Sequence, residues 1–400
     1  MIIVKKRLCL WMTFILLFVF NFNSFLYATP LSTTEEAAIQ IKGVMDLIEK
    51  NYVGKEVSIQ QLLDGALKGI FNTLDDYSTY YTEEEYQKFT EGVSGEFIGI
   101  GVEMKKYPNH IEITRVFPDS PAQKAGIQAG DHILEVEGEP VSKYTFDQIS
   151  KKIRGPINTQ VILTLKRGNQ QVKASVIRQP IKINPITMCT LSELLKEESN
   201  EELSSLLYVQ ISEFNGQTVE AFDEVLEYVE KNQIKGILFD VRNNPGGILS
   251  QVIQVCKKII PKGPIVYTIN KNGDHRVAYS YLEKAFIPMV VLVNEYSASA
   301  AEIFASALQD SGVGKLVGEK TFGKGIVQRL YQNKNGGYFK MTTEEYLTRN
   351  KNHIHGKGIE PDFQVEGSYL IDKDNPEQTK KDVQLKKGYE VLRKWVHTKF

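Results

Sequence analysis

The residues best suited to chemistry lie between Asn294 and Gln328. Ser299 stands in a segment of small residues that follows the apolar run 287–293 and precedes apolar residues at helical spacing. The apolar run is typical of a buried strand, so the sequence predicts Ser299 at a strand-to-helix junction. The free N–H groups and positive dipole end of a helix N-terminus stabilise a developing oxyanion, which favours a nucleophile at this position.

A serine hydroxyl becomes an effective nucleophile when a base removes its proton. None of the six histidines lies in this stretch, whereas Lys324 stands between two glycines. Serine–lysine pairs are a known form of such a site, provided that burial or positive charge lowers the lysine pKa from about 10.4. Gln328 lies four residues after Lys324, a spacing that places both side chains on the same face of a strand or helix, so Gln328 is suited to orient the amine. Taken singly, Ser299 also reads as a helix cap and Lys324 as a solvated loop residue.

Three segments together resemble the carboxy-terminal processing peptidases, also called tail-specific proteases: 297–302 (Ser-Ala-Ser-Ala-Ala-Glu), 321–328 (Thr-Phe-Gly-Lys-Gly-Ile-Val-Gln) and 242–247 (Arg-Asn-Asn-Pro-Gly-Gly). The resemblance implies that Ser299 is the nucleophile, Lys324 the general base and Gln328 the orienting residue. Asp310 matches an acidic position discussed in some members, so it is a secondary catalytic candidate.

The elements that must position these residues alternate between strands and helices. Strands are predicted at 206–211, 236–241, 265–268 and 289–293, with helices after the first strand and at 248–260, and further strands at 326–330 and 338–343. This order predicts βαβ units and a largely parallel sheet, whose catalytic loops gather at the carboxyl ends of the strands. The N–H groups of Gly246 and Gly247 are then expected to supply one oxyanion donor, and that of Ala300 the other.

A second resemblance covers the region before the catalytic core. Ile98, Gly99, Ile100, Gly101 and Val102 form a glycine-interrupted apolar entry, and with the segment 119–138 they resemble a PDZ domain. Such domains bind a peptide carboxy terminus on backbone N–H groups of the glycine loop, where a Cβ would obstruct the ligand. Ordinary strand packing with a bulge is the alternative. The expected partners are therefore protein or peptide substrates with a free C-terminus.

The predicted architecture is a multidomain α/β protein. Its parts are a signal peptide or membrane anchor (1–28), a helical N-terminal segment (31–90), a mostly β PDZ domain (91–178), a catalytic core with βαβ units (179–365) and a C-terminal helical tail (366–400). The family resemblance implies a crotonase/Clp-like core. Within the N-terminal segment, residues 74–82 alone suggest only a turn, and the acidic, serine-rich run 192–205 predicts a surface loop. The resemblance also suggests that terminal helices form a homodimer; packing of the tail on its own domain is the alternative.

Composition narrows the function. The formal net charge of −1 provides no basic field, so nucleic-acid binding is set aside. A basic start followed by an apolar run predicts export, with membrane association if the segment is retained. Cys189 and Cys256 either pair or pack as small hydrophobic residues. His353 and His355 lack the further ligand spacing of a metal site, so we expect no metal and no cofactor.

Two other functions fit part of the sequence. Residues 318–324 nearly match a nucleotide-binding loop, but Gly325 stands where that loop needs Ser or Thr for magnesium. A catalytically idle PDZ scaffold that only binds peptides is the second alternative. The joint presence of Ser299, Lys324 and Gln328 favours an exported serine endopeptidase that acts through an acyl-enzyme.

Overall fold

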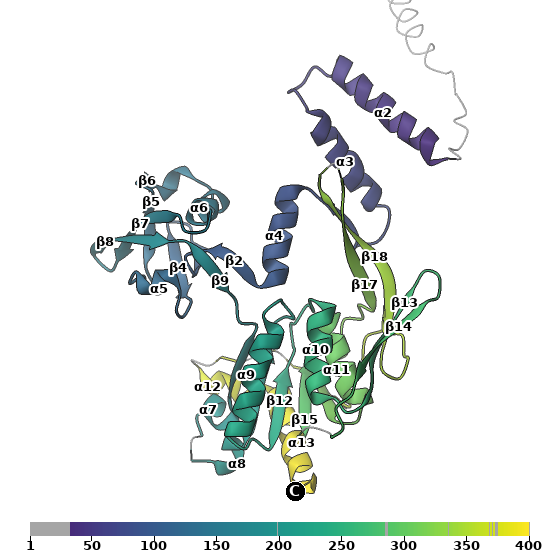
Figure 1. Cartoon of the computed structure of the whole chain (residues 1–400). Helices are drawn as coiled ribbons and strands as arrows, with labels where there is room; N and C mark the ends of the chain where they lie inside the picture. Colours follow the sequence, from purple (N-terminus) through teal and green to yellow (C-terminus); the bar gives the residue numbers. More distant parts are fainter. Residues whose placement is uncertain are drawn as a thin grey trace, which may run out of the picture. The chain divides into compact units, whose positions relative to one another are not determined.

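The computed structural model describes residues 33–197, 199–284, 287–334, 336–367, 369, 371–372 and 375–399. The chain divides into two compact units, Met1–Thr73 and Leu74–Phe400 (Figure 1). The predicted signal or anchor at residues 1–28 lies outside the described residues. Among the helices that are described, none has both the length and the apolar character needed to cross a membrane.

The described part of the first unit contains two helices, α2 (Thr34–Asn51) and α3 (Ile59–Phe71). Each begins with a capping box, in which a hydroxyl side chain accepts from the backbone three residues on and a Glu or Gln side chain reaches back. Thr33 pairs in this way with Glu36, and Ser58 with Gln61. The predicted helical start of the N-terminal segment is therefore confirmed.

The second unit begins with strand β1 (Thr79–Tyr81) and helix α4 (Glu83–Ser94). β1 pairs antiparallel with the first residues of β18 (Tyr338–Leu347). The prediction of only a turn for residues 74–82 is therefore wrong in its second half. A three-residue strand is too short to show a period of its own, and its partner lies far along the chain.

A mostly β domain follows, as predicted. Its sheet has the order β3-β4-β5-β7-β8, with β6 beside β5. The strands are β3 (Val102–Lys106), β4 (Ile111–Val116), β5 (His132–Val136), β6 (Glu139–Pro140), β7 (Gln160–Arg167) and β8 (Gln170–Ile177). Two helices, α5 (Pro121–Lys124) and α6 (Phe146–Ile153), and the 3-10 turn η2 (Val141–Lys143) complete it. The domain has its own apolar core, and β2 (Glu96–Gly99) pairs with β9 (Gln179–Lys182) where the chain enters and leaves it.

A six-stranded sheet forms the centre of the following region. Its order is β10-β11-β12-β15-β16-β19. The strands are β10 (Ile186–Thr190), β11 (Leu206–Ile211), β12 (Gly236–Asp240), β15 (Met289–Val293), β16 (Gly314–Gly318) and β19 (Phe363–Gln364). All neighbours from β11 to β19 are parallel, and only β10 at the edge is antiparallel. The predicted largely parallel sheet is confirmed.

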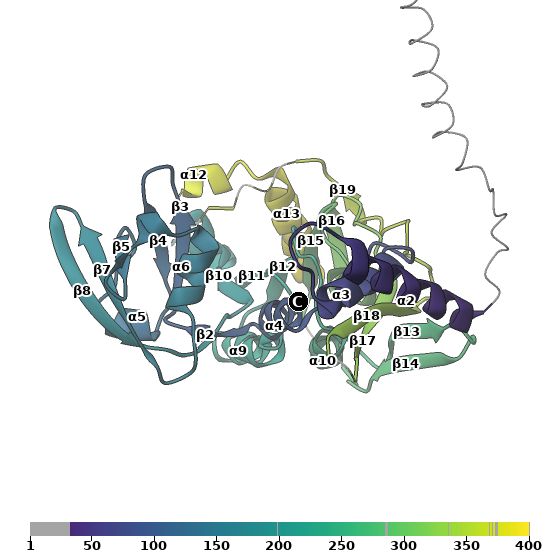
Figure 2. The ribbon, with the colours of Figure 1, turned by 90° about the horizontal axis from the view of Figure 1, so that it is seen from above.

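Helices cover both faces of this sheet (Figure 2). One face packs against α9 (Thr218–Lys231), α10 (Leu249–Ile259) and α11 (Ala300–Asp310), and the other against α13 (Val383–Lys399). The side chains of consecutive strand residues point to opposite faces of the sheet. Phe239 therefore belongs to the apolar core on the first face, and Leu238 to the core on the second. Because Leu385 and Leu392 of α13 are buried in the second core, the tail packs on its own domain, which was one of the two predicted alternatives.

A second sheet is antiparallel and carries part of the site. It contains β1, β18, β13 (Gly263–Asn270) and β14 (His275–Ser280) in that order, with β17 (Ile326–Gln332) beside β18. The predicted strands at 326–330 and 338–343 are confirmed. Placing residues 265–268 in the parallel sheet was wrong, because β13 pairs with β14 and β18 instead.

The run 192–205 is also more ordered than predicted. It contains α7 (Leu191–Leu195) and α8 (Glu201–Ser204), and a further short helix, α12 (Pro376–Thr379), precedes α13. Leu191, Leu194 and Leu203 are buried, which explains why an acidic, serine-rich segment is held against the core.

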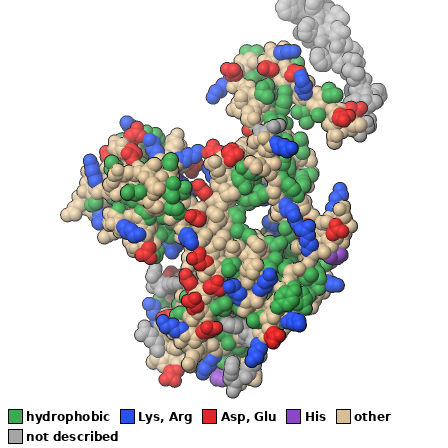
Figure 3. Space-filling view, in the orientation of Figure 1, with side chains coloured by type: hydrophobic (Ala, Val, Ile, Leu, Met, Phe, Trp, Pro, Cys, Tyr) green, Lys and Arg blue, Asp and Glu red, His purple; other side chains and the backbone are tan. Residues whose placement is uncertain are grey.

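Figure 3 shows acidic and basic side chains interspersed over the face drawn, in keeping with the net charge of −1.

Candidate active site

Ser299 lies at the predicted junction. β15 ends at Val293 and α11 begins at Ala300, so Ser299 immediately precedes the first helical turn. Its backbone has φ 55° and ψ −114°, and an unusual conformation of this kind costs a non-glycine residue about 1–3 kcal/mol. The surrounding contacts must therefore hold Ser299 in place.

The buried carboxylate of Glu302 ties Ser299 to Lys324. Its Oε2 accepts hydrogen bonds from the backbone N–H groups of Ser299 and Lys324, both at 2.8 Å. Its Oε1 accepts from Thr321 Oγ1 at 2.6 Å and from the Gly323 N–H at 2.7 Å. Glu302 is completely buried, and these four donors compensate the cost of removing its charge from water.

Tyr346, on β18, joins the same two residues from another side. Its hydroxyl lies 3.0 Å from the carbonyl oxygen of Ser299 and 2.6 Å from that of Lys324, and it donates to this pair of acceptors. Burial, reinforced by the negative charge of Glu302, raises the pKa of Tyr346 well above its usual value. The phenol therefore stays a donor at neutral pH.

Lys324 occupies an environment that suits a base. Burial lowers the pKa of Lys324, and the positive charge of Lys340 lowers it further, while Asp75 and Glu302 act in the opposite direction. The net shift is downward, so a larger fraction of the amine is neutral at a given pH than for a lysine in water. The ammonium nitrogen lies over the ring of Tyr77, 4.5 Å from its centroid.

The loop 242–247 lies beside Ser299. An added Cβ on Gly246, which has φ 103°, would come within 2.7 Å of Ser299 Cβ and 2.9 Å of the Ala300 nitrogen. Only glycine therefore allows this approach. The Gly246 N–H donates to Asn244 Oδ1 at 2.8 Å, so Gly246 is not available as the oxyanion donor that the sequence suggested. Gly247 and Ala300 remain the candidate donors.

Side-chain amides fasten this loop to the segment before Ser299. The Asn243 N–H donates to Asn294 Oδ1, and Asn294 Nδ2 donates back to Asn243 Oδ1, both at 2.9 Å. The Ala298 N–H donates to the carbonyl oxygen of Asn244 at 2.9 Å. The two loops at the carboxyl ends of β12 and β15 are thus joined, as the parallel topology requires.

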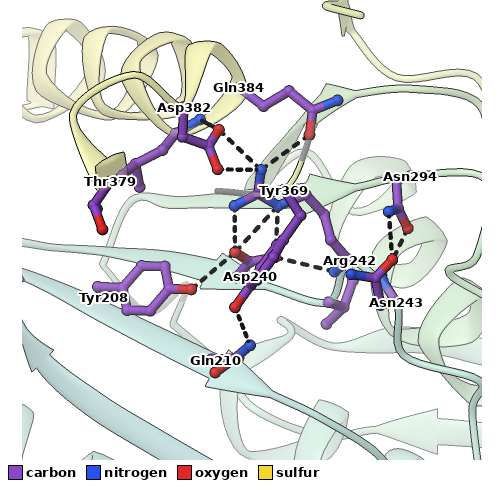
Figure 4. A network of polar contacts seen from close by, with 12 residues as sticks. Tyr208, Gln210, Asp240, Arg242, Asn243, Asn294, Tyr369, Thr379, Asp382 and Gln384 are labelled. Atoms are coloured by element: carbon purple, nitrogen blue, oxygen red, sulfur yellow. Dashed lines mark hydrogen bonds and ion pairs between the residues drawn. The ribbon is translucent and has the colours of Figure 1, made fainter. Parts of the chain in front are cut away.

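A buried polar network anchors the start of the loop to the C-terminal segment (Figure 4). Arg242 donates to both oxygens of Asp240, to both oxygens of Asp382 at 2.9 and 3.0 Å, and to Gln384 Oε1 at 3.0 Å. The Tyr208 hydroxyl donates to Asp240 Oδ2 at 2.8 Å. Both members of each ion pair are fully buried, so removal of Arg242 would leave two buried carboxylates without its counter-charge.

Gln328 and Asp310 are the two remaining catalytic candidates. Gln328 lies on β17, and its Nε2 donates to Thr342 Oγ1 of β18 at 3.2 Å. Its role in orienting Lys324 stays a prediction. Asp310 is the last residue of α11, about 16 Å along the helix axis from Ser299. Its Oδ2 accepts from the Asn350 N–H at 3.0 Å. The catalytic prediction for Asp310 is therefore wrong, because the helix that begins beside Ser299 carries it away from the site.

Four of the five predicted peptide-binding residues line a cleft of about 760 Å³ whose wall is formed by the PDZ-like domain and by α4. Gly99, Ile100, Gly101 and Val102 belong to its wall, and α6 contributes Phe146. Gly101 has φ 83°, and an added Cβ would meet Ser120 Cβ at 2.3 Å. Ile98, which lies on β2, does not line the cleft, and its side chain is exposed.

A cluster of potential metal ligands and two cysteines are the other groups that could bind a metal or react. His110, Glu112 and His132 of the PDZ-like domain place three potential metal-ligand atoms within 4.8 Å of one another, outside the region of Ser299. No disulfide joins Cys189 to Cys256 in the described part of the chain. Burial raises the pKa of the Cys256 thiol, which argues against a thiolate nucleophile there.

The nucleotide-loop alternative also fails on topology. A phosphate-binding loop leads into a helix whose N-terminus faces the phosphates. Residues 318–324 instead lead into strand β17. This connection lacks the helix dipole that such a site requires.

Sequence reasoning missed four residues of the site, Glu302, Tyr346, Asp75 and Tyr77. Glu302 stands three residues after Ser299, the spacing of a capping box, which could have indicated its bond to the Ser299 N–H. The others come from distant segments, so no local pattern identifies them.

Comparisons with known proteins identify families that are similar to three parts of the chain. The model of peptidase family S41 matches residues 205–365, a PDZ domain model matches residues 112–167, and a model described as the activating protease CtpB N-terminal domain matches residues 27–85. These matches confirm the resemblance and the predicted order of N-terminal segment, PDZ domain and α/β core.

Curated relatives and a solved structure extend the similarity over most of the chain. The chain is similar to a "Probable CtpA-like serine protease" of Staphylococcus aureus (strain N315), with 34% identity over 342 residues, 84% of this chain and 66% of the relative. A protein of the same name from Staphylococcus epidermidis is 36% identical over 82% of this chain and 65% of its own length. The chain thus spans slightly less than two thirds of these relatives. A solved photosystem II D1 C-terminal processing protease has a TM-score of 0.50 and 25% identity, covering 86% of this chain and 96% of its own.

Proposed function

We propose that the chain is a member of the carboxy-terminal processing peptidases of family S41, and that it is an exported serine endopeptidase that cleaves peptide bonds with a Ser299–Lys324 dyad. The observation that carries the proposal is the shared carboxylate of Glu302, which accepts from the backbone N–H groups of both residues at 2.8 Å. Glu302 thereby fixes the backbone of the proposed nucleophile and of the proposed base relative to each other, which is the positioning that a dyad requires.

The proposed reaction begins when Ser299 Oγ attacks the carbonyl carbon of the scissile bond. Lys324 Nζ takes the hydroxyl proton, and the N–H groups of Gly247 and Ala300 stabilise the oxyanion. When the tetrahedral intermediate collapses, the C–N bond breaks and the Lys324 ammonium gives its proton to the leaving amine. Water then attacks the acyl-serine ester with Lys324 again as the base, which releases the new carboxylate and restores Ser299.

Substrate recognition is assigned to the PDZ domain, with proposed bounds 91–178. Its cleft offers a strand edge and a glycine turn, on which the free carboxylate of a peptide end would rest. A peptide with a free C-terminus is expected to bind more tightly than the same peptide as an amide. Equal affinities for the two, measured by calorimetry, would contradict carboxylate recognition.

Export, membrane association and a homodimer remain part of the proposal. The basic and apolar residues 1–28 support export, and N-terminal sequencing of the protein from the cell envelope would show whether they are cleaved. Sedimentation at several concentrations would test the dimer.

Serine labelling separates the peptidase from the idle scaffold. We expect a fluorophosphonate probe to modify Ser299 in the purified protein in the presence of a PDZ-binding peptide, with the site mapped by mass spectrometry. Lys324→Ala should suppress labelling, because it removes the base. Peptide binding without any labelling of Ser299 would instead support the scaffold.

A further inference from the structure

We propose that Asp75 and Tyr77, from the turn that precedes β1, are positioning residues of the catalytic centre. Tyr77 provides the ring face on which the Lys324 amine rests, and Asp75 fixes that ring and places a negative charge near the lysine. The inference rests on the proposed function, because it assigns these two residues to the base of the dyad.

The turn is locally well defined. Asp75 Oδ1 accepts from the Tyr77 N–H at 2.8 Å, and Asp75 Oδ2 accepts from Ser78 Oγ at 3.0 Å. The Ser78 N–H also donates to the Asp75 carbonyl oxygen at 3.2 Å. An aspartate that bonds to the backbone two residues on is a characteristic turn former, so the Asp75 side chain sets the position of Tyr77.

The turn is also fixed to the strand behind the site. The Thr342 N–H donates to Ser78 Oγ at 3.0 Å, and Thr342 Oγ1 donates to Asp75 Oδ1 at 3.3 Å. Gln328 Nε2 in turn donates to Thr342 Oγ1 at 3.2 Å. A continuous chain of hydrogen bonds therefore runs from Gln328 through Thr342 to Asp75, which gives Gln328 a defined route of influence on the site.

The contact with the base is direct for Tyr77. The Lys324 nitrogen lies 4.5 Å from the centroid of its ring, within the distance at which a cation is attracted to a ring face. Tyr77 is half-buried, and burial raises the pKa of its phenol, with the nearby acidic residues adding to the effect. The Tyr77 phenol therefore remains neutral at the pH at which Lys324 loses its proton, and its ring can contact the lysine in either protonation state.

The charges around Lys324 determine the expected effect of Asp75. Burial and Lys340 lower the lysine pKa, while Asp75 and Glu302 raise it. The cavity that Asp75 and Tyr77 share is also lined by Lys271, Glu344, Glu345 and His355, so these titratable groups surround the same space. Removing the charge of Asp75 eliminates one of the two raising influences, and the lysine pKa should fall further.

A purely structural role would give a different result. If the turn only held β1 against β18, its loss would reduce the amount of folded enzyme without changing how the remaining activity depends on pH. A charge that acts on Lys324 instead moves the acid limb of the rate profile. The pH profile therefore distinguishes the two roles.

The first test compares Asp75→Asn with the parent enzyme on an unstructured polypeptide across a pH series. Asparagine keeps the size of the side chain and an oxygen for the Tyr77 N–H, so the turn should remain. We expect the midpoint of the acid limb of kcat/KM to move to lower pH. Asp76→Asn, which removes the same charge one residue away, is the matched control and should keep the parent midpoint. An unchanged midpoint in Asp75→Asn would overturn the role of its charge.

The second test concerns the ring. Tyr77→Phe preserves the ring face and should retain activity within about threefold, whereas Tyr77→Leu should lose about 10- to 100-fold in kcat, the scale expected when a catalytic group is displaced by about 1 Å. Equal activity of the leucine and phenylalanine variants would overturn the positioning role. Ser299→Ala and Lys324→Ala are measured in the same assay: if either keeps full activity, the proposed function fails, whatever the Tyr77 variants show.

A readout independent of catalysis keeps the proposal testable if a variant is poorly active. In the Ser299→Ala background, trace acetylation of Lys324 with acetic anhydride, quantified by mass spectrometry over a pH series, reports the neutral amine. Adding Asp75→Asn should make Lys324 reactive at lower pH, and adding Asp76→Asn should not. If the pH at which Lys324 becomes reactive is the same in the Asp75→Asn and Asp76→Asn variants, the inference is contradicted. If Asp75→Asn does not fold, as judged by circular dichroism, the Tyr77 pair decides.

Discussion

Replacement of Glu302 by glutamine is the sharpest perturbation of the scaffold that joins Ser299 to Lys324. The substitution keeps the shape of the side chain but replaces one carboxylate oxygen by an NH2 group. Each oxygen of Glu302 faces two donors, at distances between 2.6 and 2.8 Å. Whichever way the amide turns, its NH2 group faces two of these donors.

The cost follows from those two donors. At the Oε2 position both are backbone N–H groups, and at the Oε1 position one is an N–H and the other the Thr321 hydroxyl. Each buried donor left without an acceptor costs about 1–3 kcal/mol, so Glu302→Gln should lose about 2–6 kcal/mol of unfolding free energy. If the Thr321 hydroxyl rotates and becomes the acceptor of the new NH2 group, only the Gly323 N–H is left without an acceptor, and the loss is about 1–3 kcal/mol.

Urea unfolding followed by tryptophan fluorescence measures this loss. The chain has two tryptophans, Trp11 and Trp395, and Trp395 lies on α13, which packs against the parallel sheet. In protein lacking residues 1–28, fluorescence therefore reports on unfolding of the parallel sheet, which α13 and the Glu302-bearing α11 cover from opposite faces. Glu227→Gln on the exposed side of α9 is the control and should change the free energy by less than about 0.5 kcal/mol. A loss below about 1 kcal/mol for Glu302→Gln would refute the reasoning that its charge is matched to four donors.

Three further predictions address the neighbouring parts of the site. Arg242→Met leaves the buried carboxylates of Asp240 and Asp382 without the counter-charge of Arg242 and should cost about 3–5 kcal/mol in urea unfolding; a loss under about 1 kcal/mol would contradict the network. Gly246→Ala should abolish detectable peptide cleavage, because its Cβ would lie 2.7 Å from Ser299 Cβ, and full activity would show that the loop is more adaptable than its contacts indicate. The cleavage rate should rise with pH through a midpoint below 10.5, since the neutral form of Lys324 is the base and its pKa is lowered; a rate that falls over this range would contradict that assignment.

Much of the framework could be predicted because its signals are local. The strands 206–211 and 289–293 match β11 and β15 residue for residue, since each is a short, nearly continuous apolar run with a clear end. The position of Ser299 followed from one such strand and the helical spacing after it. The parallel arrangement then required the loop 242–247 to lie nearby, which the approach of Gly246 confirms.

The parts that could not be predicted depend on long-range pairing. β13 has the same apolar character as a parallel strand, but its hydrogen-bond partners are β14 and β18. Tyr346 and Asp75 contribute through contacts with segments far away in the chain, so their roles appear only after the antiparallel sheet is assembled. Asp310 shows the converse error, because a residue close in sequence to Ser299 is carried away by the helix between them.

The most direct test of the central claim is cleavage of one unstructured polypeptide, with a free or an amidated carboxy terminus, by the protein and by its Ser299→Ala and Lys324→Ala variants. Mass spectrometry of the products gives both the extent and the position of cleavage. We predict cleavage by the unsubstituted protein alone, with a slower rate on the amidated polypeptide. Equal cleavage by all three proteins would contradict the dyad.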